Sequence, residues 1–337
     1  DAARRARRPA ARPVWQAVMK RTGIYFWTGA ALFLGGALLM TQLIGNQYPF
    51  FACYVILQFI VLAVAWSILG GYAGYVNFGT AAFFGVGVYT AVFLIKAVEA
   101  PLAVQIAVAA VIGGLMGFAL GLLTLRMQGI FFSIATIAAT IIIETAITNW
   151  RFVGGAAGIQ LQRPEVTAPF DNYVQMLFFV QALMVVLAIA ISRYIQQSWM
   201  GRGLQALKDD ELAAECTGVP TLRLKLMACI ISGALMCAAG APAAMYLQYA
   251  DPASAFNLNY SVSTLAMSLI GGTAHWAGPV IGAIVLGTTQ QLLTVTISSE
   301  VNVLVLGVML VLFVVAAPEG IIGLVRKVRR KRNEGEG

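Results

Sequence analysis

The sequence predicts an all-α protein, a polytopic transmembrane bundle of about ten helices. Hydrophobic residues make up 60% of its 337 residues, and charged residues only 11%. Soluble domains carry about a quarter charged residues, so this composition is typical of a membrane protein with several spans. Ten apolar runs of roughly 20 residues, the length that a membrane-spanning helix needs, indicate the same class.

The runs are separated by polar or glycine-rich intervals. They cover residues 24–44, 49–70, 72–96, 101–125, 129–150, 172–194, 224–247, 258–274, 276–297 and 301–322. The first run is longer than the apolar core of a signal peptide, about 7–15 residues, so we interpret it as a retained helix. The sequence therefore divides into a basic tail (1–23), a transmembrane domain (24–323) and a second basic tail (324–337).

The basic residues predict the orientation of this domain. Loops rich in lysine and arginine stay in the cytoplasm. With ten spans and a cytoplasmic amino terminus, all of the 22 basic residues except Lys96, Arg151 and Arg163 fall on that side, and the carboxyl terminus does too. The net charge of +8 lies mostly beside apolar runs, so we expect contact with an anionic membrane surface and not with nucleic acid.

A long charged interval, residues 199–226, lies between two apolar runs. Residues 202–216 have helix-forming composition, and Gly218 followed by Pro220 predicts the end of that helix. Leu204 and Leu207, with Leu212 beside them, make the helix amphipathic. Two interpretations are open, a solvated loop and a docking helix for a cytoplasmic partner.

Glycines crowd the third run and the junction of the eighth and ninth runs. They predict either close helix packing or broken helices that line a cavity. Spans two to five and seven to ten form two sets of four that begin on opposite sides of the membrane. This order is typical of an inverted repeat in a transporter.

The sequence encodes no recognisable catalytic site. It has no paired carboxylates, no nucleophile with a histidine base and no phosphate-binding glycine loop. His275 is the only histidine, and the four cysteines lack metal-type spacing. We therefore expect a chain that is not an enzyme and holds no metal or cofactor; if ATP drives it, ATP and Mg²⁺ bind other subunits.

Two further features suggest a pathway for a solute. Glu144 lies well inside an apolar run, where an ionisable group usually faces a bundle interior or a cavity. We expect it to face the pathway or to hold a broken helix. The interval 151–171, predicted to lie outside, is either a plain connector or a contact for an extracytoplasmic binding protein.

Several segments carry a resemblance to a known family. GRGLQALKDDELAAECTGVPTLRLKL (201–226) resembles the cytoplasmic coupling loop of ABC-importer permeases, with its Glu-Ala-Ala signature. Four other segments match in the same order: GGYAGYVNFGTAAFFGVGVYTA, RMQGIFFSIATIAATIIIET, VGGAAGI and LIGGTAHWAGPVIGA. Together, over about residues 54–322, they are most similar to the M-type permease subunits (LivM) of branched-chain amino acid importers.

The resemblance implies a type II ABC-importer-like permease with an inverted repeat, located in a bacterial inner membrane. Its expected partners are a second homologous permease, two ATPase subunits and a periplasmic binding protein. The expected substrates are branched-chain or related hydrophobic amino acids. Alternatives are a sister importer for urea, short amides or aromatic acids, and a stand-alone secondary transporter.

The resemblance also implies two groups of site residues. The leucines of the coupling helix would enter a groove on the ATPase, with Lys208, Asp209, Asp210 and Glu211 as the polar rim. The full coupling set is Arg202, Leu204, Leu207, Lys208, Asp209, Asp210, Glu211, Ala213, Ala214, Glu215 and Gly218. The pathway candidates are Tyr75, Asn77, Gly79, Thr80, Tyr89, Glu144, Gly271 and Gly272. Residues 74–80 read Gly-Tyr-Val-Asn-Phe-Gly-Thr where the family usually has about Gly-Gln-Leu-Ser-Leu-Gly-His, which leaves the substrate open.

Overall fold

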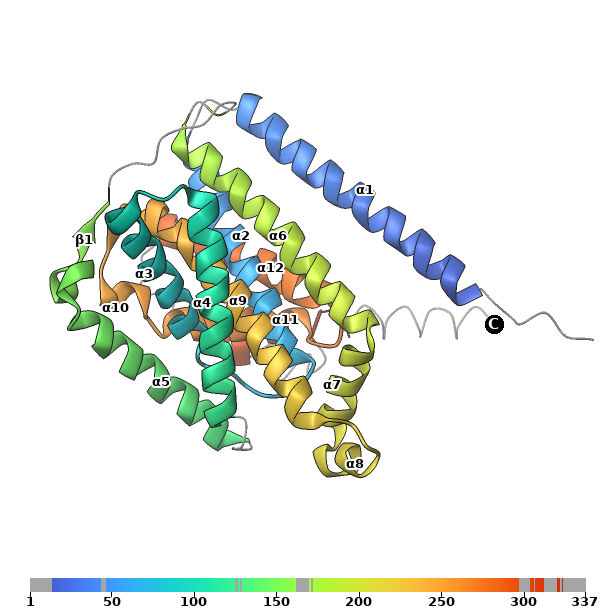
Figure 1. Ribbon diagram of the computed structural model, residues 1–337. Coiled ribbons are helices and arrows are strands. Elements are labelled where there is room, and N and C mark those ends of the chain that lie inside the picture. Colours follow the sequence, from blue (N-terminus) through green and yellow to red (C-terminus); the bar gives the residue numbers. More distant parts are fainter. Residues whose placement is uncertain are drawn as a thin grey trace, which may run out of the picture. The chain divides into compact units, whose positions relative to one another are not determined.

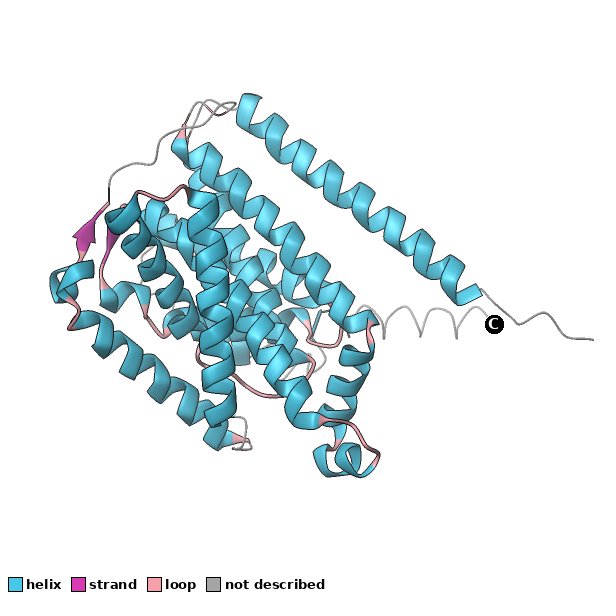
Figure 2. Ribbon diagram, viewed as in Figure 1, coloured by secondary structure: helices cyan, strands magenta, loops and turns pink. Residues whose placement is uncertain are grey.

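The computed structural model describes residues 14–43, 47–124, 127, 129–161, 170, 172–296, 304–305, 307–311, 320–321 and 323. Helices dominate these residues (Figures 1 and 2). Several predictions lie outside the described residues: those for the tail 1–13, Arg126, the loop 162–169, most of the tenth run and the tail 324–337.

Residues 1–45 form a unit of their own. Its described part is one helix, α1 (Val14–Leu43), within which Tyr25–Leu43 is long and apolar enough to cross a membrane. The first predicted span is therefore confirmed.

The second unit, residues 46–337, is a bundle of long apolar helices. These are α2 (Tyr48–Trp66) with its π-helical extension η1 (Ser67–Gly71), α3 (Thr80–Val98), α4 (Leu102–Thr124), α5 (Ile130–Thr148), α6 (Tyr173–Gln197) and α9 (Thr221–Leu247). Together with α1 they give 7 helices of spanning length within the described part of the chain. They match the first seven predicted runs, so the polytopic all-α class is confirmed.

The remaining elements are short, apart from the last helix. They are η2 (Arg151–Val153), η3 (Gly155–Ala157), β1 (Ile159–Gln160), α7 (Trp199–Asp209), α8 (Glu211–Cys216), β2 (Tyr249–Ala250), α10 (Pro252–Ala255), α11 (Asn259–Gly271) and α12 (Ala277–Thr296). The two-residue strands β1 and β2 pair antiparallel and tie the connection after α5 to the end of α9.

Helix α9 lies at the centre of the bundle and packs against α3 and α4. Small residues allow the backbones to approach closely. A Cβ atom on Gly87 of α3 would lie 1.9 Å from the Cys237 carbonyl oxygen of α9, and one on Gly240 of α9 would lie 2.2 Å from the Phe84 carbonyl oxygen. Membrane helices associate through such small-residue contacts because lipid provides no hydrophobic drive between them. These glycines confirm the packing interpretation for the interior of α3.

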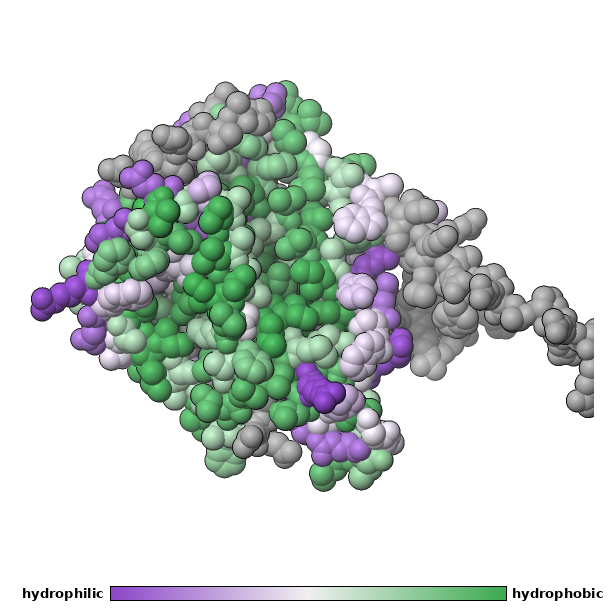
Figure 3. Space-filling view, in the orientation of Figure 1, coloured by the Kyte–Doolittle hydropathy of each residue, from purple (hydrophilic) through white to green (hydrophobic). Residues whose placement is uncertain are grey.

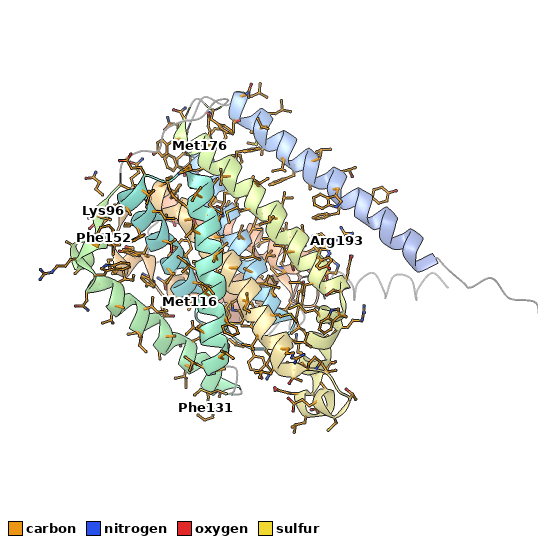
Figure 4. All side chains as sticks on the ribbon, viewed as in Figure 1. Lys96, Met116, Phe131, Phe152, Met176 and Arg193 are labelled. Carbon is orange, nitrogen blue, oxygen red and sulfur yellow. The ribbon has the colours of Figure 1, made fainter. Side chains whose placement is uncertain are left out.

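One end of the bundle, here called the strand end, carries β1 and β2. The starts of α2 and α6 meet there, where Gln47 Nε2 donates to Asn172 Oδ1 at 3.2 Å. Lys96, in the last turn of α3, donates to the Phe152 carbonyl oxygen at 2.7 Å and lies over the Phe152 ring (Figure 4). The ends of α3, α5 and α9 therefore share this side of the molecule.

The opposite end, here called the charged end, carries α7 and α8 (Figure 1). The end of α6 reaches the connection between α11 and α12 there, since Gln196 Nε2 donates to the Ala274 carbonyl oxygen at 3.1 Å. Between the two ends, α4 and α5 present a broad hydrophobic face (Figure 3). Ile130 and Phe131 are 77% and 72% exposed on this face, which suits contact with lipid tails.

The third membrane-spanning helix begins later in the structure than the sequence predicts. The run 72–96 was expected to be helical throughout, but α3 starts only at Thr80, after a non-helical segment of residues 72–79. Gly74 has φ +79°, a conformation that side chains disfavour. The break is called the 72–79 break below. Hydropathy missed it because its residues are mostly buried and apolar.

Side chains from three helices satisfy the backbone of the 72–79 break. Trp66 Nε1 donates to the Asn77 carbonyl oxygen at 2.8 Å, and Ser133 Oγ donates to the Val76 carbonyl oxygen at 2.8 Å. Ser261 Oγ donates to the Phe78 carbonyl oxygen at 2.6 Å and accepts from the Ala81 N–H at 3.0 Å. Non-helical backbone is tolerated at membrane depth only when protein groups replace water in this way.

The eighth predicted span is also corrected. Helix α11 has 13 residues, about 20 Å at the helical rise, and a membrane core is about 30 Å thick. It ends at Gly271, the next residue Gly272 has φ +101°, and five residues separate the end of α11 from the start of α12. Gly271, Gly278 and Gly282 lie so close to neighbouring backbone that each Cβ would fall within 2 Å of a carbonyl oxygen. The glycines here both allow the helix to end and allow the two backbones to pack closely.

Candidate functional site

The charged interval 199–226 folds as two short helices at the charged end. The predicted single helix 202–216 is wrong, because Asp210 has extended backbone angles between α7 and α8. Its carboxylate accepts the Ala213 N–H at 3.0 Å and so caps α8. Ser198 caps α7 by accepting the Gly201 N–H at 3.4 Å. Aspartate at position 210 favours a helix start there, and this interrupts the longer pattern.

Gly218 ends α8, as the sequence predicts. It has φ +85° directly after the C-cap residue Thr217. Its N–H donates to the Glu215 carbonyl oxygen at 2.9 Å, and the Val219 N–H donates to the Ala214 carbonyl oxygen at 3.1 Å. This left-handed termination satisfies the last carbonyls of the helix and suits glycine.

The apolar side of the interval points inward. Leu204 and Leu207 are 0% and 4% exposed where α7 packs against α6 and α9, so the expectation that they enter a groove on a partner is wrong. Leu212 remains 72% exposed on α8. The other exposed coupling candidates are Arg202, Lys208, Asp209, Asp210, Ala213, Glu215 and Gly218; Ala214 is buried. The exposed members gather at the charged end, where polar side chains interrupt the hydrophobic surface (Figure 3).

Helix α7 contacts the 72–79 break directly. Lys208 Nζ donates to the carbonyl oxygen of Gly71, at the end of η1, at 2.9 Å. A Cβ atom on Gly74 would lie 3.1 Å from the Lys208 Cγ. The aliphatic part of Lys208 therefore lies along the break, while its ammonium group holds the end of the preceding helix.

Helix α8 contacts the same break through a cluster of three side chains, here called the Tyr75 cluster. Tyr75 donates from its hydroxyl to Glu211 Oε2 at 2.7 Å. Lys225, in the first turn of α9, forms an ion pair with Glu211 Oε1 and lies over the Tyr75 ring, 4.7 Å from its centroid. The Lys225 side chain is 4% exposed and that of Glu211 is 22% exposed. Glu211 therefore turns toward the bundle, whereas Lys208 is exposed and only its ammonium group reaches the end of η1; its place in a polar rim stays a prediction.

The electrostatics of the cluster follow from this geometry. Burial alone would raise the pKa of Glu211, but hydrogen bonds from Lys225 and Tyr75 and the positive charge of Lys225 outweigh it and lower the pKa below 4.5. Burial raises the pKa of Tyr75. The hydrogen bond to Glu211 and the negative charge of Glu211 raise this pKa further. Glu211 is therefore charged and Tyr75 neutral near pH 7, so both hydrogen bonds persist.

A groove of about 630 Å³ opens at this place. Its walls are residues 73–76 of the break, then Gly129, Ile130 and Ser133 at the start of α5, and residues 207–212 of α7 and α8. Leu212, which is 72% exposed, lines it together with Glu211 and Lys208. A partner that binds α8 would therefore also touch the 72–79 break.

The structure places most predicted pathway residues elsewhere. Of that set, only Tyr75 lines this groove. The side chain of Asn77 accepts the Gly79 N–H at 2.7 Å inside the break. The hydroxyls of Thr80 and Tyr89 are buried with no hydrogen-bond partner in the part of the chain described.

Glu144 does not interrupt its own helix, and its expected role at a pathway or a broken helix stays a prediction. It is half-buried on α5, which is continuous from Ile130 to Thr148. Gly271 and Gly272 lie in the tight turn between α11 and α12. Sequence reasoning missed Lys225, Ser133 and Ser261, whose only signal is a polar side chain within or beside an apolar run.

Comparison with known proteins gives a consistent set of matches. A family model described as "Branched-chain amino acid transport system / permease component" matches residues 48–314. The high-affinity branched-chain amino acid transport system permease protein LivM of Escherichia coli (strain K12) is 26% identical over 300 residues, covering 82% of this chain and 70% of that protein.

The matches extend to a second permease type. The probable branched-chain amino acid transport permease protein LivH of Methanocaldococcus jannaschii is 26% identical over 264 residues, covering 74% of this chain and 83% of that protein. The LivH permease of Escherichia coli (strain K12) is 27% identical over 150 residues, covering 44% of this chain and 47% of that protein. No solved structure matches the chain significantly.

Proposed function

This chain belongs to the family of permease components of branched-chain amino acid transport systems, and from this premise we propose that it is one permease subunit of an ABC importer. It forms, with a second homologous permease, the pathway for branched-chain or related hydrophobic amino acids. The relatives include both LivM and LivH permeases, which supports a partner of the same kind. As a transport permease it is not an enzyme.

The remaining subunits supply energy and substrate. Two ATPase subunits bind the charged end, and they hold the ATP and Mg²⁺ that this chain lacks motifs to bind. A periplasmic binding protein delivers the substrate to the strand end. The charged end then faces the cytoplasm of a bacterial inner membrane, with both termini on that side; Arg193, Arg202, Lys208 and Arg223 on this end support the orientation.

One observation carries the coupling role of residues 199–226. Lys208 and the Tyr75 cluster join α7 and α8 to the 72–79 break through hydrogen bonds and a largely buried ion pair. Because the backbone groups of residues 76–78 bond to side chains of other helices, these side chains determine the position of the middle of the break. A force applied to α8 by an ATPase is therefore passed to the start of α3 without a flexible loop between them.

Docking of the ATPase is tested at Leu212. In Leu212→Asp we expect at least tenfold less ATPase to co-purify with the permease, because a charge replaces the exposed apolar side chain that would be buried in the contact. The Leu212→Met variant keeps an apolar side chain and serves as the matched control. The measurement is the ATPase-to-permease ratio after mild detergent extraction of the complete transporter.

Two outcomes would contradict the proposal. Equal ATPase recovery from Leu212→Asp and wild type would move the docking site away from α8. Leucine flux into liposomes that contain only the permease, without ATP, would favour a stand-alone secondary transporter.

The termination of α8 is tested at Gly218. In Gly218→Leu we expect insertion at the wild-type level but at least fivefold slower uptake per ATP hydrolysed, because a left-handed backbone costs a side chain about 1–2 kcal/mol. No atom lies within 4 Å of the Cβ position, so strain and not a clash causes the effect. Gly218→Asn is the control, since asparagine tolerates this conformation. Normal coupling in the leucine variant would show that α8 need not end here.

A further inference from the structure

A second hollow, of about 470 Å³, lies away from the charged end. Its walls come from α2, α9, α10, α11 and α12, and it includes the last turn of α9 beside β2. It is therefore nearer the strand end than the groove beside α7 and α8. Pockets of roughly 300–1,000 Å³ hold small molecules, so its size suits a solute such as an amino acid.

The lining combines uncharged polar groups with apolar ones. The described residues that line it include the amides Gln58, Asn257, Asn259, Gln290 and Gln291, and none of them is charged. Val55, Phe59, Tyr246 and Tyr260 supply apolar and aromatic surface. An uncharged lining favours a ligand without net charge, and the apolar part of the lining suits a small hydrocarbon side chain.

Gln58 is the clearest sign that a polar ligand belongs here. It lies in the middle of the apolar helix α2, is only 5% exposed, and lines the hollow. Among the hydrogen bonds between described residues, none is made by its amide. Its amide is not among the fully enclosed polar atoms that lack a partner, so it is open to the hollow, where water or a solute can bond to it. A solute in the hollow would provide that partner.

Two helix ends with opposite partial charge meet at the hollow. The last turn of α9 contributes Ala243, Tyr246 and Leu247, and the first turn of α11 contributes Asn259 and Tyr260. The helix dipole gives a helix carboxyl end a partial negative charge and an amino end a partial positive charge. At the start of α11 the N–H groups of Asn259 and Tyr260 already donate to the side chain and the carbonyl oxygen of Asn257, so the dipole, and not free N–H groups, acts on a ligand there. An ammonium group suits the first end and a carboxylate suits the second.

We propose that this hollow binds the transported solute within the membrane, and that it recognises a zwitterion with a small apolar side chain. The ammonium lies toward the end of α9, the carboxylate toward the start of α11, and the Gln58 amide bonds the head group. The inference rests on the proposed function, but it assigns the solute to residues other than the 72–79 break and Glu144.

The test uses the complete transporter in nanodiscs without the binding protein. Leucine binding is followed by saturation-transfer NMR, which detects weak ligands. Gln58→Leu is expected to weaken leucine binding about tenfold, the effect of losing one well-placed hydrogen bond in a buried site. Gln181→Leu is the matched control, because Gln181 is a fully buried glutamine of α6 that does not line the hollow. The Gln181→Leu variant should bind leucine with the wild-type affinity.

Ligand analogues test the two helix ends. Isovalerate lacks the ammonium group and isoamylamine lacks the carboxylate, so each is expected to bind at least tenfold more weakly than leucine. Equal binding of either analogue, or unchanged leucine affinity in Gln58→Leu, would overturn the inference. If Gln58→Leu fails to fold, Gln291→Leu tests the opposite wall, where the side chain is only half-buried.

The outcomes separate this inference from the proposed function. One outcome is that the transporter takes up leucine with ATP but the Gln58 and Gln291 variants bind leucine as the wild type does. This outcome would refute the hollow as the binding site without contradicting the proposed importer function. Absence of ATP-driven uptake in the wild-type transporter, with its binding protein supplied, would instead refute the proposed function.

Discussion

Replacing Glu211 with alanine is expected to lower the free energy of unfolding by about 3 kcal/mol and to reduce ATP-driven uptake at least tenfold. The variant leaves the Lys225 ammonium, whose side chain is 4% exposed, without its counter-ion. It also removes the acceptor of the Tyr75 hydroxyl and so detaches α8 from the 72–79 break. Denaturant unfolding in detergent measures the first effect, and uptake into liposomes by the complete transporter measures the second.

Two companion variants separate stability from coupling. Lys225→Met should cost less stability than Glu211→Ala, because Glu211 is 22% exposed and water can solvate its unpaired charge. The double variant Glu211→Leu with Lys225→Met should recover stability to within about 1 kcal/mol of wild type, since it leaves no uncompensated charge. Its uptake should stay low. Wild-type uptake in the double variant would show that the ion pair stabilises the fold without transmitting motion.

The pH dependence of stability provides an independent check on the same pair. The pKa of Glu211 is lowered in the folded protein, so its stabilising effect is complete above the ordinary value of 4.5. It is lost as the pH falls through the lowered folded value. The stability difference between wild type and Glu211→Ala should therefore be constant near pH 7 and shrink below about pH 4.5. A difference that grows on acidification would contradict the ion pair.

The second large effect is expected at Gly282, in the first half of α12. A Cβ atom there would lie 1.8 Å from the carbonyl oxygen of Met267 and 2.8 Å from the N of Gly271. Both are backbone atoms, so a rotamer change cannot relieve the clash, and α12 must separate from α11. Gly282→Ala should therefore destabilise the protein by about 3 kcal/mol or more. We expect most of the variant to elute as aggregate in fluorescence-detected size-exclusion chromatography.

Gly287, on the same helix, supplies the matched control. The nearest atom to its Cβ position is 3.5 Å away in the side chain of Ile56, an ordinary van der Waals distance. Gly287→Ala should give the wild-type elution profile and uptake. Similar profiles for the two variants would mean that α11 and α12 do not pack as closely as described.

Several features follow from the sequence because each depends on local composition. The helices of spanning length match the first seven predicted runs, since transfer into a membrane depends on the summed hydropathy of about 20 residues. Residues 199–220 of the polar interval lie between the spanning helices α6 and α9 for the same reason. Gly218 ends α8 as predicted, because a left-handed helix end has a strong local preference for glycine.

Other features could not be predicted from the sequence because they depend on contacts with residues far away in the chain. The 72–79 break resembles an apolar helix in composition, yet Trp66, Ser133 and Ser261 satisfy its backbone from other elements. Leu204 and Leu207 give α7 an apolar face, but periodicity does not say whether α9 or another subunit covers it. Aspartate capping at Asp210 divided a segment that propensity alone predicts to be one helix.

The sequence by itself determined that the chain is a polytopic helical membrane protein with a charged segment outside the membrane, because burial in lipid and exposure to water select composition residue by residue. Only the tertiary structure decided which polar residues meet. The pairing of Tyr75, Glu211 and Lys225, and the convergence of Gln58 with the ends of α9 and α11, join residues up to about 200 positions apart. Such contacts are fixed by the packing of whole helices, which no local pattern encodes.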